Sequence, residues 1–95
     1  MIVFNKSAGL VVVLTAFCMN HAVAQDRCRV TDPTGSPLNV RAAPNGSVDG
    51  TVRNGEMVRI IMTDHDDRGR TWAFIERLRD KQTLGWVYRE FISCF

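Results

Sequence analysis

The chain has 95 residues and a formal net charge of +2, with 12 basic and 10 acidic side chains, which limits it to one small domain. Charges this close to balance exclude the cation excess that nucleic-acid phosphates and anionic lipid surfaces require, so neither is an expected partner. The short length also limits the core, because a domain of about 60 to 70 residues buries only about 60% of the surface of its unfolded chain.

Residues 1–24 have the pattern of a secretory signal peptide. A lysine precedes an apolar run at 8–18, and Ala22 and Ala24 provide the small side chains that signal peptidase needs at its cleavage site. The sequence therefore predicts a cleavable signal-peptide helix followed by a mature domain at 25–95. Such a protein would be secreted, with the periplasm as its expected location.

Two other interpretations of this first segment are weaker. The apolar run covers about half of the roughly 20 residues that a helix needs to cross a membrane, which disfavours an anchor. A lipoprotein would be processed at Cys18, but Phe17 stands where that processing requires a small side chain. No membrane association is therefore expected once the segment is cleaved.

Two cysteines remain in the predicted mature domain, Cys28 near its start and Cys94 near its end. An oxidising compartment favours a disulfide between them. In the chain-entropy description, such a crosslink stabilises the fold by roughly 4 kcal/mol, because it restricts the unfolded chain over most of its length. A redox pair or a nucleophilic cysteine is the functional alternative.

Gly or Pro recurs every few residues between 33 and 69, a pattern that favours short strands joined by turns. Alternating, β-branched and aromatic residues predict strands at 28–31, 38–41, 56–64, 71–78 and 85–88. Turns are predicted at 32–35, 44–46 and 54–55, and Asn-Gly in the last two accepts the left-handed backbone conformation at low cost. Five or six short strands point to an all-β barrel or sandwich, and closure would remove its exposed edges.

Alternation within the strands predicts which side chains lie inside. In 56–64, for example, Val58, Ile60 and Met62 share one face of an extended strand. A helix over 72–79 is the alternative for one segment, although no glycine stop follows it closely. The expected interior set is Val30, Leu38, Val40, Val52, Val58, Ile60, Ala73, Ile75, Val87 and Ile92.

Three stretches, LNVRAAPNGSVDGTVRNGEMVRI, RTWAFIE and GWVYREFISC, resemble the bacterial SH3 (SH3b) domain, and the likeness covers about residues 28–95. The resemblance implies a small SH3-like barrel of five to six short, strongly bent strands. It also implies one tight helical turn at 88–91 and a last strand at 92–94 that returns beside the first. Cys94 would then lie close to Cys28.

The wider SH3 class binds proline-rich segments in a groove of aromatic rings. Trp72 falls where that groove has a tryptophan, Phe91 where it has a tyrosine, and Tyr88 where it has a proline. Because Tyr88 replaces the proline, recognition of proline-rich segments is not expected. Trp72, Tyr88 and Phe91 are the predicted ligand contacts and Trp86 is a further candidate, with a place in the core as the alternative role of each ring.

Residues suited to catalysis or metal binding are sparse in the mature domain. Metal donors occur together only at 64–67, as Asp64, His65, Asp66 and Asp67. Four neighbours without a spaced, glycine-pivoted loop rarely face one ion, so a solvated acidic loop is expected, with no metal and no cofactor. The arginines at 68, 70, 77, 79 and 89 are either a carboxylate-binding patch or ordinary surface charges paired with acidic neighbours.

The sequence as a whole predicts a non-enzymatic, monomeric binding module that recognises a peptide of the cell envelope, from peptidoglycan or from an envelope protein. This expectation rests on the export signal, on the resemblance and on the lack of a catalytic constellation. The alternative is a small inhibitor or stabilising subunit that docks on a secreted enzyme through a strand edge or loop. An enzyme that depends on His65 ranks last.

Overall fold

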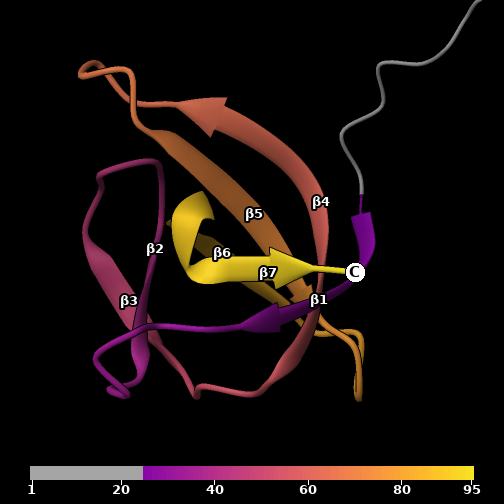
Figure 1. Ribbon diagram of the computed structural model, residues 1–95. Helices are drawn as coiled ribbons and strands as arrows, with labels where there is room; N and C mark the ends of the chain where they lie inside the picture. The colour runs from indigo at the N-terminus through magenta and orange to yellow at the C-terminus, as the bar shows by residue number, and fades with distance from the viewer. Residues whose placement is uncertain (1–24) are drawn as a thin grey trace, which may run out of the picture.

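The computed structural model describes residues 25–95 (Figure 1). This part of the chain contains seven strands and one 3₁₀ turn, joined by loops. In chain order they are β1 (Gln25–Val30), β2 (Leu38–Arg41), β3 (Val48–Val52), β4 (Met57–His65), β5 (Thr71–Arg77), β6 (Thr83–Tyr88), η2 (Arg89–Phe91) and β7 (Ile92–Cys94). The all-β prediction is confirmed, and the helical alternative for 72–79 is wrong because β5 extends to Arg77 and a turn follows it. The predicted signal peptide, residues 1–24, lies outside the described residues.

The strands form one antiparallel sheet in the order β3-β2-β6-β5-β4-β1-β7. β5 lies at its centre, and β3 and β7 are its edges, with no pairing between these two edges in residues 25–95. β4 and β5 bend strongly, so the sheet curls around its own interior (Figure 1). No helix among the described residues has the length and apolar character needed to cross a membrane.

β3 is a seventh strand where five to six were expected. Its sequence, VDGTV, contains Asp49 and Gly50, two residue types that are depleted in strands. It pairs along the whole of β2 but leaves four of its five residues exposed. Pairing with β2 across the predicted Asn-Gly turn therefore holds most of β3 in place, and Val52 is its only buried side chain.

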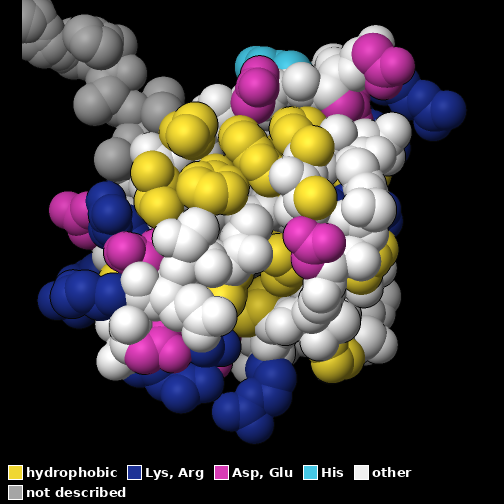
Figure 2. Space-filling model, turned by 180° about the vertical axis from the view of Figure 1, so that it is seen from behind, with side chains coloured by type: hydrophobic (Ala, Val, Ile, Leu, Met, Phe, Trp, Pro, Cys, Tyr) yellow, Lys and Arg dark blue, Asp and Glu magenta, His cyan; other side chains and the backbone are white. Residues whose placement is uncertain are grey.

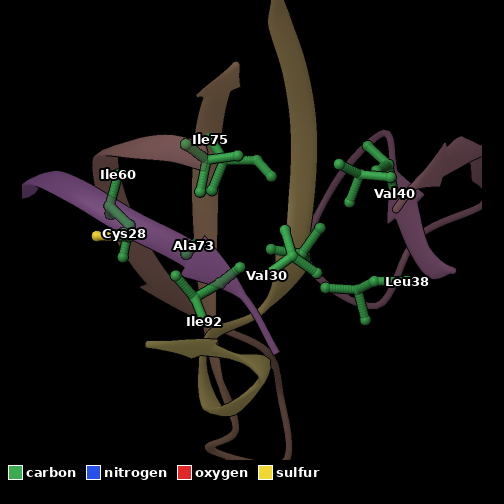
Figure 3. Close-up of a cluster of buried hydrophobic side chains, with 11 residues drawn as sticks. Cys28, Val30, Leu38, Val40, Ile60, Ala73, Ile75 and Ile92 are labelled. Carbon is green, nitrogen blue, oxygen red and sulfur yellow. The ribbon is translucent and has the colours of Figure 1, made fainter. Parts of the chain in front are cut away.

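All ten predicted interior residues are buried in one cluster, together with Cys28. Figure 3 shows labelled side chains of this cluster pointing from several strands into one interior. Met62 departs from the predicted alternation, because the pairing of β4 shifts between Ile60 and Met62, and Met62 is 45% exposed. An inserted residue turns the following side chains to the other face, so the prediction that Met62 shares a face with Ile60 is wrong.

A disulfide joins Cys28 in β1 to Cys94 in β7, which confirms the predicted crosslink. The two residues are opposite each other in the antiparallel register and 66 positions apart in the sequence. Thr31 adds two hydrogen bonds beside it: its backbone N donates to Phe91 O at 2.8 Å, and its Oγ1 lies 2.7 Å from Ser93 Oγ. The end of the chain is thus tied to its first strand, as the resemblance implied.

Reduction of the disulfide is expected to lower the free energy of unfolding by roughly 2–5 kcal/mol, because the unfolded chain gains conformational freedom. Chemical denaturation followed by tryptophan fluorescence, with and without reductant, measures this loss. The Cys94→Ser variant should lose a similar amount and then show no response to reductant. An unchanged unfolding midpoint in the reduced wild-type protein would contradict the stabilising role of the crosslink.

Gly85 marks the closest approach of β6 to β2. Its φ is +139°, and a Cβ added there would lie 2.8 Å from Val40 Cγ1 and 2.9 Å from the carbonyl oxygen of Arg41. A backbone oxygen in a paired strand cannot move aside as the end of a flexible side chain can. The glycine that precedes Trp86 is therefore required by the packing of the two strands.

We expect Gly85→Ala to lower the free energy of unfolding by about 2–4 kcal/mol, because it combines an unfavourable φ with a backbone clash. Gly50→Ala is the matched control, since Gly50 lies in the edge strand β3 and no atom lies within 4 Å of its added Cβ. That control should change stability by no more than about 0.5 kcal/mol. Equal denaturation midpoints for the two variants would show that the close approach of β2 does not require glycine at position 85.

Candidate functional site

The pleat of β5 separates its aromatic side chains from the core. Ala73 and Ile75 belong to the inner cluster. Because successive side chains of a strand point to opposite faces, Trp72 and Phe74 lie on the outer face of the sheet. Trp72 is buried without being part of the inner cluster, so it must be covered from the outside.

β6 repeats this arrangement next to β5. Val87 is in the core, and Trp86 and Tyr88 on either side of it point outward. The register places Tyr88 opposite Trp72 and Trp86 opposite Phe74. The first pair is stacked with ring centroids 4.2 Å apart, and the second is tilted with centroids 5.1 Å apart. The outer face of β5 and β6 therefore carries two cross-strand pairs of rings.

The three predicted ligand contacts lie together and form what we call the aromatic cluster: Trp72, Tyr88 and Phe91. Tyr88 joins the other two, because it stacks on Trp72 and meets the edge of Phe91 at a centroid distance of 5.8 Å. Trp72 is only 1% exposed, whereas Tyr88 and Phe91 are partly exposed. The accessible surface of the cluster thus belongs to Tyr88 and Phe91, with Trp72 as the base beneath Tyr88. Ligand contact by these residues stays a prediction.

One carboxylate, that of Asp66, organises the loop between β4 and β5. Its Oδ2 accepts hydrogen bonds from Trp72 Nε1 at 3.0 Å and from Arg70 Nε at 2.8 Å. Its Oδ1 accepts from the backbone amides of Arg68 at 2.9 Å and Arg70 at 3.0 Å. The Asp66 side chain is 2% exposed, so the prediction of a solvated loop is wrong for this residue. The other members of the predicted acidic loop are exposed: Asp64, His65 and Asp67.

These contacts hold Asp66 in its ionised form. Burial by itself would raise its pKa, but the hydrogen bonds from Trp72, from two backbone amides and from the Arg70 side chain outweigh burial and hold the pKa well below its ordinary value of 3.8. The four hydrogen bonds that this carboxylate accepts stabilise the loop and hold the Trp72 indole in place. Within residues 25–95, no three His, Cys, Asp or Glu side chains are grouped as a metal site requires.

Two guanidinium groups flank the aromatic cluster. Arg70 Cζ lies 5.4 Å from the centroid of the Tyr88 ring, and Arg41 Cζ lies 5.8 Å from that of Trp72. Arg41 is held in this position by a 2.8 Å hydrogen bond from its Nη1 to Gly46 O. A cation over an aromatic face is attracted by the ring quadrupole, with about 0.5–1 kcal/mol at exposed sites. The cluster thus places apolar ring surface beside cations, a combination suited to an apolar side chain and a neighbouring peptide carbonyl or carboxylate.

A second apolar group crosses the same outer face. The register aligns Arg41, Trp86, Phe74 and Met62 across β2, β6, β5 and β4. On the side of the molecule seen in Figure 2, hydrophobic side chains gather in the middle and charged side chains border them. Trp86 was a candidate from the sequence, and the alternation of β5 contains a signal for Phe74. The outward position of Met62 could not be predicted, because it depends on the irregularity in β4.

The arginines singled out in the sequence do not form one patch. Arg77 pairs with Asp80 at 2.8 Å, and this hydrogen-bonded contact lowers the pKa of Asp80 to about 2. Arg89 Nη1 donates to Ile92 O at 2.7 Å. Arg70 and Arg77 lie at opposite ends of β5. Most of these side chains therefore pair locally, which is the ordinary role expected of surface arginines.

Comparison of the chain with models of protein families, with curated proteins and with solved structures gives no match. The SH3b resemblance rests on the sequence motifs alone.

Acidification should destabilise the protein below about pH 4. Asp66 and Asp80 both have pKa values lowered by folding, so the stability they contribute is complete above the unfolded value of 3.8 and is lost as the pH falls toward the folded values. Thermal unfolding measured from pH 7 to about pH 2 tests this dependence. Asp80 is a smaller contributor, because its side chain is 40% exposed and solvent screens its ion pair.

Asp66→Asn is expected to remove the larger part of this acid dependence. It should also shift the NMR resonance of the Trp72 indole N–H, which loses an ionised acceptor. Asp67→Asn is the matched control, because Asp67 is the exposed neighbour in the same loop, and it should change neither property. An acid dependence that is the same in both variants would show that Asp66 does not hold the loop.

Proposed function

We propose that this chain is a non-enzymatic binding module of the bacterial SH3 (SH3b) type that is exported to the periplasm and binds a peptide on the aromatic cluster. The peptide would come from peptidoglycan or from an envelope protein. One observation carries the proposal: the partly exposed ring of Tyr88 stacks on a buried Trp72, whose indole is hydrogen-bonded to Asp66, and meets the partly exposed ring of Phe91.

Fixed rings favour binding for a thermodynamic reason. Aromatic side chains offer a large contact area and lose little conformational freedom, which is why they dominate binding hot spots. Here Trp72 is already immobilised by its hydrogen bond to Asp66, and Tyr88 is stacked on it. A ligand that covers Tyr88 would therefore cost little additional ordering of the protein. Arg70, beside the Tyr88 ring, adds a cation for a carbonyl or carboxylate of the peptide.

The order of elements supports an SH3-like barrel as the fold of this module. A short 3₁₀ turn, η2, joins the last two strands, and β7 pairs with β1. Both features were implied by the resemblance. The glycine of GWVY, Gly85, lies where β6 approaches β2 too closely for a side chain. The helical turn and the pairing of the last strand thus occur as the resemblance implies, and Gly85 is required by strand packing.

Export is supported by two features of different kinds. The signal-peptide pattern of residues 1–24 is one of them. The other is the disulfide between Cys28 and Cys94, since disulfides persist in oxidising compartments such as the periplasm. Together they favour a function outside the cytoplasm, where cell-wall peptides and envelope proteins are the accessible ligands.

The edge strand β3 favours a second candidate, a small inhibitor or stabilising subunit of a secreted enzyme. Four of the five residues of β3 are exposed, and Val48 is a large apolar side chain at its start. An extended segment of a partner can add to such an edge through backbone hydrogen bonds. Co-purification with one secreted protein at a fixed stoichiometry would favour this candidate over peptide binding.

Tyr88→Ala should weaken binding of soluble peptidoglycan fragments or envelope-protein peptides by about tenfold or more, because it removes the partly exposed ring at the centre of the cluster. Isothermal titration with the purified, disulfide-bonded protein measures the affinity. Trp72→Ala is a poorer test, since it also removes the partner of Asp66 and would disturb the loop.

Phe95→Ala is the matched control, because Phe95 is an exposed ring outside the aromatic cluster. It should leave the affinity unchanged, and circular dichroism should show that both variants fold. If Tyr88→Ala and Phe95→Ala retain ligand equally well, the aromatic cluster is not the binding site.

A further inference from the structure

A second site lies at the other end of β5, away from the aromatic cluster. It is an open hollow of about 350 Å³, lined by Arg53, Asn54, Gly55, Glu56 and Arg79. In Figure 1 the β3–β4 turn and the β5–β6 turn lie at the lower end of the molecule, and the β4–β5 loop lies at the upper end. Leu78 N donates to Met57 O at 3.0 Å, which keeps the two lower turns together.

The walls of this hollow are fixed by hydrogen bonds. Asn54 Oδ1 accepts from Asp32 N at 2.6 Å, and its Nδ2 donates to Ser36 O at 2.9 Å. The Asn54 side chain therefore has a structural role, because it connects the β3–β4 turn to the β1–β2 connection. Gly55 has a φ of +85°, and no atom lies within 4 Å of where its Cβ would be, so this wall has open space above it.

Charge in the hollow is unbalanced. Glu56 is its single carboxylate, 12% exposed, and its Oε2 meets Arg79 Nε at 3.4 Å, a long contact through one nitrogen. The Arg79 side chain is 62% exposed, so most of its guanidinium donors face solvent. Arg53 makes no side-chain hydrogen bond or ion pair with any residue in 25–95. The hollow thus contains two guanidinium groups and one acid, and the acid contacts only Arg79.

We infer that this hollow, the arginine pocket, binds a carboxylate group of a peptide, either a free C-terminus or an Asp or Glu side chain. The planar fork of a guanidinium matches a carboxylate in a bidentate contact, which a point charge such as lysine cannot reproduce. Arg53 supplies a fork that no residue in 25–95 occupies, and Arg79 supplies the donors that Glu56 leaves free. The hollow is near the lower limit of small-ligand pockets, about 300 Å³, which suits one terminal residue rather than a long segment.

This inference does not depend on the proposed function of the aromatic cluster. The lining residues of the pocket and the members of the cluster are different, and they lie at opposite ends of β5. Variants in one site therefore leave the other intact. Loss of peptide binding at Tyr88 and loss of carboxylate binding at Arg53 can be observed separately.

The test is an NMR titration of the purified, disulfide-bonded protein with three peptides. N-acetyl-trialanine with a free C-terminus should shift the backbone amide resonances of Gly55 and Glu56. Its C-terminal amide should not, because it has no carboxylate. The third peptide, N-acetyl-Ala-Glu-Ala-amide, carries only a side-chain carboxylate, and its affinity relative to the first shows which source of carboxylate the pocket prefers.

Arg53→Gln and Arg79→Gln should each weaken the binding of the free acid by about tenfold, because each removes charge-assisted hydrogen bonds. Arg68→Gln is the matched control, since Arg68 is an exposed arginine in the distant β4–β5 loop, and it should leave the affinity unchanged. The Trp72 indole resonance, unchanged in all three variants, would confirm that they fold. Equal binding of the amide, equal loss in Arg68→Gln, or affinity for inorganic phosphate as high as for the free acid would overturn the assignment.

Discussion

The disulfide between Cys28 and Cys94 fixes the short strand β7 against β1, and both proposed sites depend on this contact. β7 has three residues, too few to hold the end of a chain by backbone pairing with one neighbour. Because η2 directly precedes β7, anchoring β7 also positions Phe91 for its edge contact with Tyr88. On the other side of β1, Val30 O accepts a hydrogen bond from Gly55 N at 2.9 Å, so the same strand positions the turn that forms the arginine pocket.

β5 contributes side chains both to the core and to the outer face of aromatic rings. Its residues alternate between the inner cluster and the outer rings, so the same seven residues supply Ala73 and Ile75 to the interior and Trp72 and Phe74 to the outside. A register slip of one residue would exchange these two sets and bury polar side chains. The packing of the core and the geometry of the aromatic cluster are therefore set by the same pairing of β5 with β4 and β6.

The interior could be predicted from the sequence because it depends on a local pattern. Alternation identified every one of the ten expected core residues, and cysteine placement identified the crosslink. Three features could not be predicted, because each depends on tertiary contacts: the strand β3, held by its pairing with β2; the outward turn of Met62, caused by an irregularity in β4; and the burial of Asp66, caused by Trp72 and Arg70. The residues of the aromatic cluster were found through the resemblance, which does not specify that Trp72 lies beneath Tyr88.

The separation of the two sites limits the kind of ligand that can use both. Trp72 and Arg79 lie near the two ends of β5, and a strand of seven residues at about 3.3 Å per residue spans roughly 20 Å. A single amino acid or a small anion can therefore occupy only one site. An extended peptide would need about seven residues between its ring contact and its carboxylate to reach both. If both proposed sites bind, two weak contacts at this spacing would reinforce each other through effective concentration, and a peptide of matching length would bind more tightly than either part alone.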